Sequence, residues 1–207
     1  MKFLPEDAET LARIQQWRRD VRHFRTDSVP QAVLDRLQTA MDYAPSVGNS
    51  RPWHVLRVES ATLRSGVRAE FERCNGDAAK AYAGEQRDAY CALKLAGLDA
   101  APVQLAVFTA IDPSEGHGLG RRTMPETLRQ STAMAVHGLW LAARAENLGV
   151  GMVSILDPRR MEFLFGMDAQ WEFSAYLCVG WPAFVDDTPL LHRDGWQENT
   201  ATRWDVR

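Results

Sequence analysis

Apolar residues recur at helical spacing in several parts of the chain, and this spacing predicts the main helices. Leu11, Ile14 and Trp17 share one face of a helix over residues 7–18. A second helix follows between two prolines, which serve as start and stop signals. This second helix covers residues 31–44. The remaining predicted helices cover residues 61–75, 125–147 and 158–165.

Four segments have the pattern of β-strands. Residues 54–58 alternate between apolar and polar side chains, which is typical of a strand with one covered face. Residues 103–110 are a continuous run of β-prone residues, which predicts a central strand buried on both faces. Residues 150–156 and 173–181 are predicted as two further strands. Helices segregated from a few strands indicate one α+β domain over residues 1–207.

The predicted helix over residues 125–147 is nearly apolar around its whole circumference, with many alanines beside Met134, Leu139 and Trp140. Such a helix is buried in its own chain or against a copy of itself. Gly149 is predicted to stop it, because a residue without Cβ suits the left-handed cap. This helix, added to the α+β pattern, predicts a dimer.

Two segments have weaker patterns. Residues 76–98 are alanine-rich and charged without a strong apolar face, so they are either an exposed helix or a surface lid. The tail over residues 182–207 has little periodicity, yet it contains Trp196 and Trp204. Two tryptophans in an irregular tail indicate that it packs on something, such as a partner subunit.

Composition narrows the class of protein and its partners. Of 207 residues, 45% are hydrophobic and 25% are charged, with a net charge of −3. This balance favours a globular protein without affinity for nucleic acid or an anionic membrane. The apolar runs are shorter than the ~20 residues that span a bilayer, and residues 1–10 do not resemble a secretory signal. Three scattered cysteines indicate reduced thiols, so we expect a cytoplasmic protein.

An arginine-rich segment is the first candidate for chemistry. Arg18, Arg19 and Arg22 surround Asp20 where the first helix is predicted to end. The guanidinium group is a planar fork of donors that matches a phosphate, so the segment predicts an anion site with an acid/base group inside it. The alternative is an ordinary solvated run of charges.

Two glycine-containing segments are weaker candidates. In the turn over residues 45–53, Gly48 would let the backbone approach a ligand, while Ser46 supplies a hydroxyl. Ser154 follows two glycines at the end of a predicted strand. Each segment taken alone is also compatible with a purely structural role.

Other chemistries are poorly supported. Gly118 and Gly120 give GxG without the third glycine of a nucleotide-fold fingerprint, and the segment follows a loop rather than a strand. The chain has neither a Walker sequence nor a GxSxG elbow, and its five histidines do not pair at a metal-binding spacing. His137 is expected to be a structural residue of the core or an interface. We therefore expect no metal.

These motifs together resemble the nitroreductase-like flavoprotein superfamily. Arg-Arg-x-x-Arg-x-Phe at residues 18–24 and Pro-Ser-x-x-Asn-x-x-Pro-Trp at residues 45–53 resemble the opening of its members. A closer resemblance is to the 5,6-dimethylbenzimidazole synthase family, because Asp20 stands where ordinary nitroreductases usually carry serine. The strings that complete this resemblance are residues 44–48, 93–97, 118–126, 139–146 and 149–155.

The resemblance implies a nitroreductase-like α+β fold, with a central mixed or antiparallel sheet flanked by helices, in an intertwined homodimer that holds flavin between its subunits. Residues 76–98 correspond to a lid over the flavin. Asp20 and Ser154 match the catalytic carboxylate and hydroxyl. The residues implied to bind cofactor are Arg18, Arg19, Asp20, Val21, Arg22, Ser46, Gly48 and Ser154.

Two positions depart from the family pattern, and two more are candidates for an additional contact. Arg51 stands where nitroreductases usually carry glutamine, and Met152 stands where many of the synthases carry tryptophan. Arg203 or Arg207 near the C-terminus could add a phosphate contact, although no motif selects either of them.

The implied reaction consumes reduced FMN and dioxygen, forms 5,6-dimethylbenzimidazole, the lower ligand of vitamin B12, and releases a tetrose phosphate. The protein must then hold a phosphate, exclude water and move protons during bond cleavage. Asp20 suits the proton transfer, and Ser154 would orient either the flavin–oxygen adduct or the edge of the flavin by hydrogen bonding. A separate NAD(P)H-dependent flavin reductase is the expected source of reduced FMN. The alternatives are an NAD(P)H-dependent FMN nitroreductase or quinone reductase and a non-catalytic flavin-binding protein.

Overall fold

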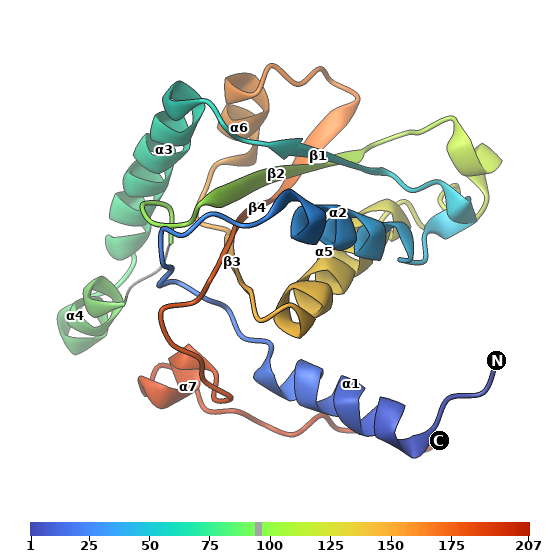
Figure 1. Ribbon diagram of the computed structural model, residues 1–207. Helices are drawn as coiled ribbons and strands as arrows, with labels where there is room; N and C mark the ends of the chain where they lie inside the picture. Colours follow the sequence, from blue (N-terminus) through green and yellow to red (C-terminus); the bar gives the residue numbers. More distant parts are fainter. Residues whose placement is uncertain (94–96) are drawn as a thin grey trace.

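A single antiparallel sheet lies at the centre of the computed structural model, which describes residues 1–93 and 97–207 (Figure 1). Its strands follow the order β1-β2-β4-β3, so β1 and β3 form opposite edges. Neighbouring strands pair antiparallel throughout, which confirms the predicted α+β class. The strands are β1 (Trp53–Arg57), β2 (Val103–Ala110), β3 (Gly149–Val153) and β4 (Trp171–Gly180).

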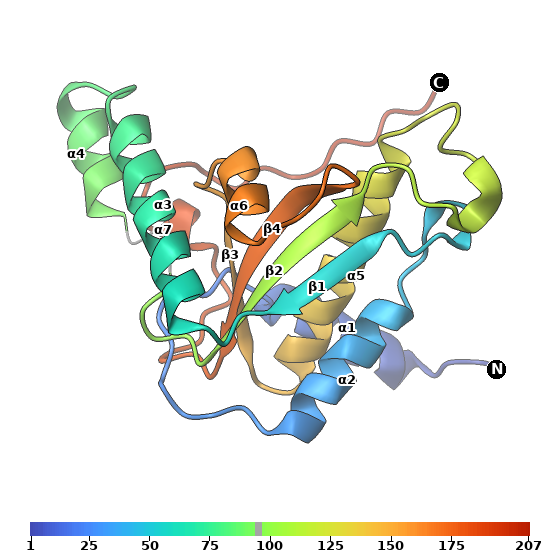
Figure 2. The ribbon, with the colours of Figure 1, turned by 90° about the horizontal axis from the view of Figure 1, so that it is seen from above.

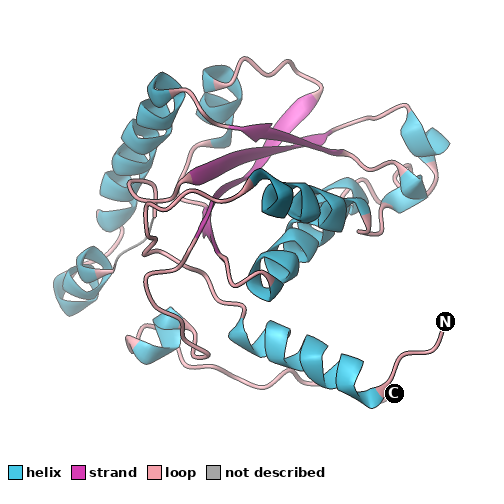
Figure 3. Cartoon of the chain, in the orientation of Figure 1, coloured by secondary structure: helices cyan, strands magenta, loops and turns pink. Residues whose placement is uncertain are grey.

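Helices cover both faces of this sheet (Figure 2). α2 and α5 pack on one face, and α3 and α6 pack on the other. The secondary structure in Figure 3 shows the sheet between these two helical layers. The helices are α1 (Pro5–Trp17), α2 (Gln31–Asp42), α3 (Ala61–Ala79), α4 (Gly84–Ala92), α5 (Thr127–Ala145), α6 (Pro158–Leu164) and α7 (Leu190–Arg193), with 3-10 turns η1 (Val47–Asn49) and η2 (Glu115–Gly118).

The central strand β2 has the bounds predicted from its apolar run, and seven of its eight residues are buried. It lies between β1 and β4 and is covered by helices on both faces, which explains its continuous hydrophobicity. β3 ends at Val153, earlier than predicted. In its pairing with β2, strand β4 contains a bulge near residue 174 that locally interrupts the ladder of hydrogen bonds.

The long helix α5 is buried on only one side. Leu139 and Ala143 pack into the core, whereas Met134 on the other side is 43% exposed. The predicted stop at Gly149 is wrong: Asn147 takes the left-handed conformation after the helix (φ +62°), and Gly149 is already the first residue of β3. Asparagine can replace glycine at this position, because its short side chain tolerates positive φ.

Helix α1 forms where its periodicity predicts, but its apolar face is left uncovered. It contains no buried residue, and the side chains of Leu11 and Trp17 remain exposed. Figure 1 shows α1 lying apart from the sheet, beside α5. An amphipathic helix of this kind needs another surface to cover its apolar side.

The tail contacts the α3–α4 region of its own chain. The Trp196 ring lies 5.6 Å from that of Tyr82 and 6.2 Å from that of Tyr90, measured between centroids. Trp204, by contrast, is exposed. The predicted packing of the tail is therefore accounted for within the chain at Trp196, while residues beyond it are uncovered.

The proposed lid segment, residues 76–98, contains the end of α3 and all of α4. α4 has one buried residue, Tyr90, whose hydroxyl donates to Asn75 Oδ1 at 2.7 Å. Residues 94–96 of this prediction lie outside the described residues. Among the described residues, no helix has the length and apolar composition needed to cross a membrane.

A buried carboxylate joins α3 to α6. Arg73 donates to both oxygens of Glu70, at 3.0 Å and 2.5 Å, and Arg160 of α6 lies 2.9 Å away. These hydrogen bonds and charges lower the pKa of Glu70 to about 2, against an ordinary value of 4.5. Since its folded pKa is depressed, the ionised group stabilises the fold above pH 4.5, and this contribution is lost as the pH falls toward 2.

Glu70→Gln is therefore expected to make the free energy of unfolding less dependent on pH in the acid range. The wild-type free energy of unfolding should fall more steeply than that of the variant between about pH 5 and pH 2. At neutral pH we expect the variant to be less stable by roughly 2 kcal/mol. This loss is smaller than the pKa shift alone would give, because solvent screens the partly exposed arginines. Urea unfolding at a series of pH values measures this. Parallel curves for the two proteins would contradict it.

Candidate functional site

The arginine-rich segment lies along the outer edge of β3. Asp20 forms a parallel bridge with Val150, and the Val21 amide donates to the Val150 carbonyl at 3.0 Å. Gly149 and Gly151 make this close approach possible. A Cβ on Gly149 would lie 2.6 Å from the Val21 side chain, and one on Gly151 would collide with the Val21 carbonyl oxygen. The two glycines therefore allow the arginine-rich segment to pack directly against β3.

Asp20 is held through both of its carboxylate oxygens. Oδ2 accepts from Arg22 Nε at 2.8 Å, and Oδ1 accepts from the backbone amide of Met152 at 2.9 Å. The side chain is 32% exposed, so solvent or a ligand can still reach it. Arg22 is more deeply buried. The carboxylate is thus fixed in position at the edge of the sheet.

The other two arginines of the motif have different surroundings. Arg18 lies over the ring of Trp140 on α5, 5.0 Å from its centroid, and burial lowers the pKa of Arg18. Arg19 donates from Nε and Nη2 to the carbonyl of Asp187 and from Nη1 to that of Arg18. Arg19 therefore ties the tail to this segment while retaining two of its five donors.

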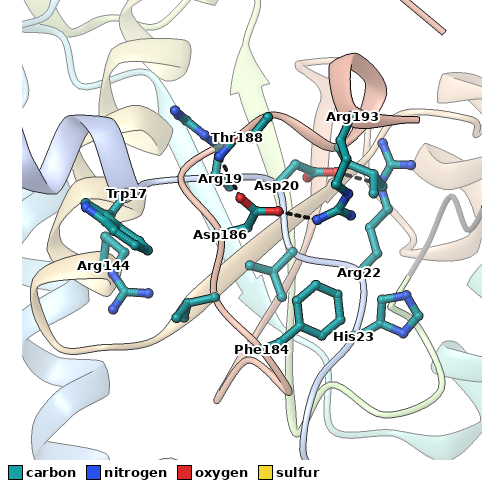
Figure 4. Close-up of a pocket in the computed structure, with 13 residues that line it drawn as sticks. Trp17, Arg19, Asp20, Arg22, His23, Arg144, Phe184, Asp186, Thr188 and Arg193 are labelled. Carbon is teal, nitrogen blue, oxygen red and sulfur yellow. Dashed lines mark hydrogen bonds and ion pairs between the residues drawn. The ribbon is translucent and has the colours of Figure 1, made fainter. Parts of the chain in front are cut away.

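A small cavity of about 50 Å³ lies against the segment, lined by Arg19, Asp20 and Arg22 (Figure 4). The tail supplies Arg193 to the same cavity, where it forms an ion pair with Asp186. Sequence reasoning missed Arg193. The available signal was the short stretch after Pro189, which predicts a helix start followed by basic residues. The alternatives predicted earlier, Arg203 and Arg207, are exposed.

A larger cavity of about 710 Å³ lies between α5 and the strands β3 and β4. Its lining includes Trp140, Met152 and Phe173. Asp20 lines the small cavity, and Met152, whose amide holds Asp20, lines the larger one. Ser154 lies two residues beyond Met152 and is exposed. It lies just past the end of β3, which stops at Val153.

The turn over residues 45–53 packs on another loop of its own chain. Gly48 has φ +58°, and a Cβ there would lie 2.9 Å from the Gly116 carbonyl oxygen. Ser46 Oγ accepts from the Arg51 amide at 3.0 Å. The Arg51 side chain donates to Asp42 at 2.5 Å, so it stabilises the turn.

The structure does not bring the two candidate motifs together within one chain. Asp20 lies beside Val150, which is level with the first residue of β2, whereas the turn lies beyond the last residues of β2. The motifs also lie on opposite edges of the sheet. Six residue rises along the strand give about 20 Å, and the four strand spacings from β1 across the sheet to the segment outside β3 give about 19 Å at right angles to this. They occupy diagonally opposite corners.

The donor set around Asp20 fits a flavin mononucleotide. Guanidinium groups of the small cavity match a phosphate, and the larger cavity has a size and an aromatic lining suited to a planar ring. Within the described residues, no group of three or more His, Cys, Asp or Glu side chains is arranged to hold a metal ion.

Comparisons with known proteins agree with this geometry. The model of the nitroreductase family matches residues 16–181. The chain is 59% identical over its full length to a 5,6-dimethylbenzimidazole synthase of Rhodobacter capsulatus, all of which it covers. It is 50% identical to the enzyme of the same description from Rhodospirillum rubrum, with 94% of this chain and 92% of that protein aligned.

The fold is also similar to that of solved structures. An oxidized iodotyrosine deiodinase, crystallised with FMN and 3-iodo-L-tyrosine, aligns with a TM-score of 0.73 over 95% of this chain and 97% of its own. The two sequences are 23% identical, so the similarity concerns the fold.

Proposed function

The chain belongs to the nitroreductase family and, within it, to the 5,6-dimethylbenzimidazole synthases, and from this membership we propose that it converts reduced FMN and dioxygen into 5,6-dimethylbenzimidazole with release of a tetrose phosphate. The full-length identity of 59% to one such synthase carries this proposal. The fixed carboxylate of Asp20 beside several arginines is the structural support for it.

The test is direct. The protein is incubated in air with FMN that a separate reductase keeps reduced, and the products are followed by mass spectrometry. We expect the benzimidazole to accumulate as FMN is lost. A protein that keeps its flavin and oxidises NAD(P)H by itself would instead be the alternative nitroreductase or quinone reductase.

We propose that Arg18, Arg22 and Arg193 hold the sugar-phosphate tail. Arg22 and Arg193 line the small cavity, and Arg18 lies over the ring of Trp140, which lines the larger one. Arg19 adds charge and anchors the tail segment at Asp187. Their combined positive charge suits a phosphate dianion.

Asp20 is proposed to accept and return a proton during cleavage of the sugar. Its hydrogen bond from Met152 fixes one oxygen at the border of the larger cavity. Ser154 is proposed to orient the ring by hydrogen bonding, with Val21 supplying the backbone that sets the segment against β3. Reduced FMN itself supplies the electrons that dioxygen requires, so the proposed reaction includes no metal.

Water exclusion is assigned to the α3–α4 region. α4 buries only Tyr90 against the rest of the described chain, so its movement would disturb little of the core. Closing this region over the ring would keep bulk water from the reacting groups.

Arg22→Ala and Arg193→Ala are each expected to weaken FMN binding by about 10-fold or more, because each removes a charged donor from the phosphate site. Riboflavin lacks the phosphate, so its affinity should change less than FMN affinity. Fluorescence titration with both flavins measures this, and Arg36→Ala, at an exposed ion pair on α2, is the control. Equal losses of affinity for FMN and riboflavin would show that the arginine concerned does not contact the phosphate.

We further propose a homodimer in which each flavin site takes its arginine segment from one chain and the turn with Ser46 and Gly48 from the other. The diagonal separation of the two motifs supports this arrangement. The uncovered apolar face of α1 and the exposed face of α5 supply surface for the partner chain.

Two measurements test the dimer. Light scattering should give twice the 23.3 kDa mass of one chain. Mixed dimers of Asp20→Asn and Gly48→Val chains should regain about a quarter of wild-type activity, since half the dimers are mixed and each has one intact site. If both motifs acted within one chain, mixing would restore nothing.

A further inference from the structure

A β-bulge in β4 places an extra residue at the wall of the larger cavity. Val107 of β2 pairs with Ala175, but the next residue, Phe108, pairs with Phe173, so Ser174 has no partner in the ladder. The bulge is anchored on one side by Glu162, whose Oε1 accepts from the Phe173 amide at 3.0 Å. Bulges of this kind often redirect a side chain beside an active site.

A chain of three hydroxyl groups anchors the other side of the bulge. Thr109 donates to Thr132 Oγ1 at 2.7 Å, and Ser174 Oγ lies 2.6 Å from Thr109 Oγ1. Thr109 and Thr132 are fully buried or nearly so. A hydroxyl has one proton, and that of Thr109 is used toward Thr132, so Ser174 must donate to Thr109.

The donor-to-acceptor direction of these hydrogen bonds determines how Ser174 can bind a ligand. With its proton committed to Thr109, its oxygen retains only acceptor lone pairs. Ser174 is exposed and lines the 710 Å³ cavity together with Met152, whose amide holds Asp20. While its proton stays on Thr109, the Ser174 oxygen can receive a hydrogen bond from an N–H group of a ligand.

We propose that Ser174 is a positioning residue that accepts a hydrogen bond from a ring N–H of the reduced flavin. This inference rests on the proposed function, because it takes the larger cavity as the place of the ring. The anionic form of reduced flavin, which is deprotonated at N1, has a ring N–H at N3 and another at N5, whereas oxidised flavin has only the one at N3. Ser174 recognises one of these two groups, and their difference gives the test its two arms.

The experiment measures binding without turnover. Affinities for reduced FMN under anaerobic conditions and for oxidised FMN are determined by titration for wild type, Ser174→Ala and Ser174→Thr. Loss of one neutral hydrogen bond should weaken binding of reduced FMN by about 3- to 10-fold in Ser174→Ala. Ser174→Thr keeps the hydroxyl and should restore affinity. Ser65→Ala, an exposed serine on α3, is the matched control.

The oxidised arm identifies the group. A loss confined to reduced FMN assigns the contact to N5–H, and equal losses in both states assign it to N3–H. Unchanged affinity in both states, or a loss that threonine does not rescue, overturns the proposal.

Flavin analogues give an independent measurement on the wild-type protein. Reduced 5-deaza-FMN lacks the N5–H group and 3-methyl-FMN lacks the N3–H group. If both bind as tightly as reduced FMN, no ring N–H is recognised and the proposal falls. Formation of benzimidazole by the wild type in air is scored separately, so failure of this contact is distinguishable from failure of the proposed function.

Discussion

Asp20→Asn should lower the rate of benzimidazole formation by about 10²- to 10⁴-fold, the range that a positioned acid/base group contributes. The asparagine keeps an oxygen that can accept the Met152 amide, so the segment should remain docked on β3. It loses the ability to take up a proton, and it loses the ion pair with Arg22. Catalysis should therefore fall far more than flavin affinity.

Product formation and FMN affinity must be measured on the same preparations. Asp27→Asn is the matched control. Asp27 lies seven residues after Asp20, forms an ion pair with Arg25 and is largely exposed. The control should retain wild-type rates. An Asp20→Asn protein that forms product at the wild-type rate would show that Asp20 is not the acid/base group.

Gly151→Ala is expected to damage the site by displacing the whole arginine segment. The new Cβ would collide with the carbonyl oxygen of Val21, a backbone atom that cannot rotate away. Overpacking of this kind costs about 1–3 kcal/mol of stability. The segment must move off β3 to relieve the clash, which breaks the hydrogen bond between Asp20 and Met152.

For Gly151→Ala we expect loss of both activity and FMN affinity, each by at least about 10-fold. Thermal unfolding, titration and product assays together separate this variant from Asp20→Asn, which should keep its flavin. Gly76→Ala is the control: Gly76 lies in α3 with open space around it, so alanine there should be neutral or slightly stabilising. A fully active Gly151→Ala protein would contradict the docking that we describe.

Local sequence patterns predicted the elements well, because most follow from periodicity. β2 was predicted residue for residue, since a strand buried on both faces is apolar at nearly every position. Helix ends were less predictable: Gly149 was expected to stop α5, but Asn147 takes that conformation and leaves Gly149 to the strand. The early end of β3 at Val153 was not predicted either, because its pairing partner β4 lies in a different part of the sequence.

The candidate site was predicted in part. The arginine segment around Asp20 was visible because its residues are adjacent in sequence. Arg193 was missed, since only the folded tail brings it to the same cavity. The hydroxyl chain through Ser174 joins three elements, so no spacing in the sequence indicates it. The placement of the turn at the opposite corner of the sheet depends on topology rather than on motif.

The docking of the arginine segment also bears on aggregation. β3 is the last strand of the sheet, and an uncovered last strand is a template on which other chains can add. Asp20 and Val21 occupy that template, and the positive charges beside them repel a second copy. The segment proposed to grip the substrate thus also covers the edge of β3 on which fibril-like self-association would start.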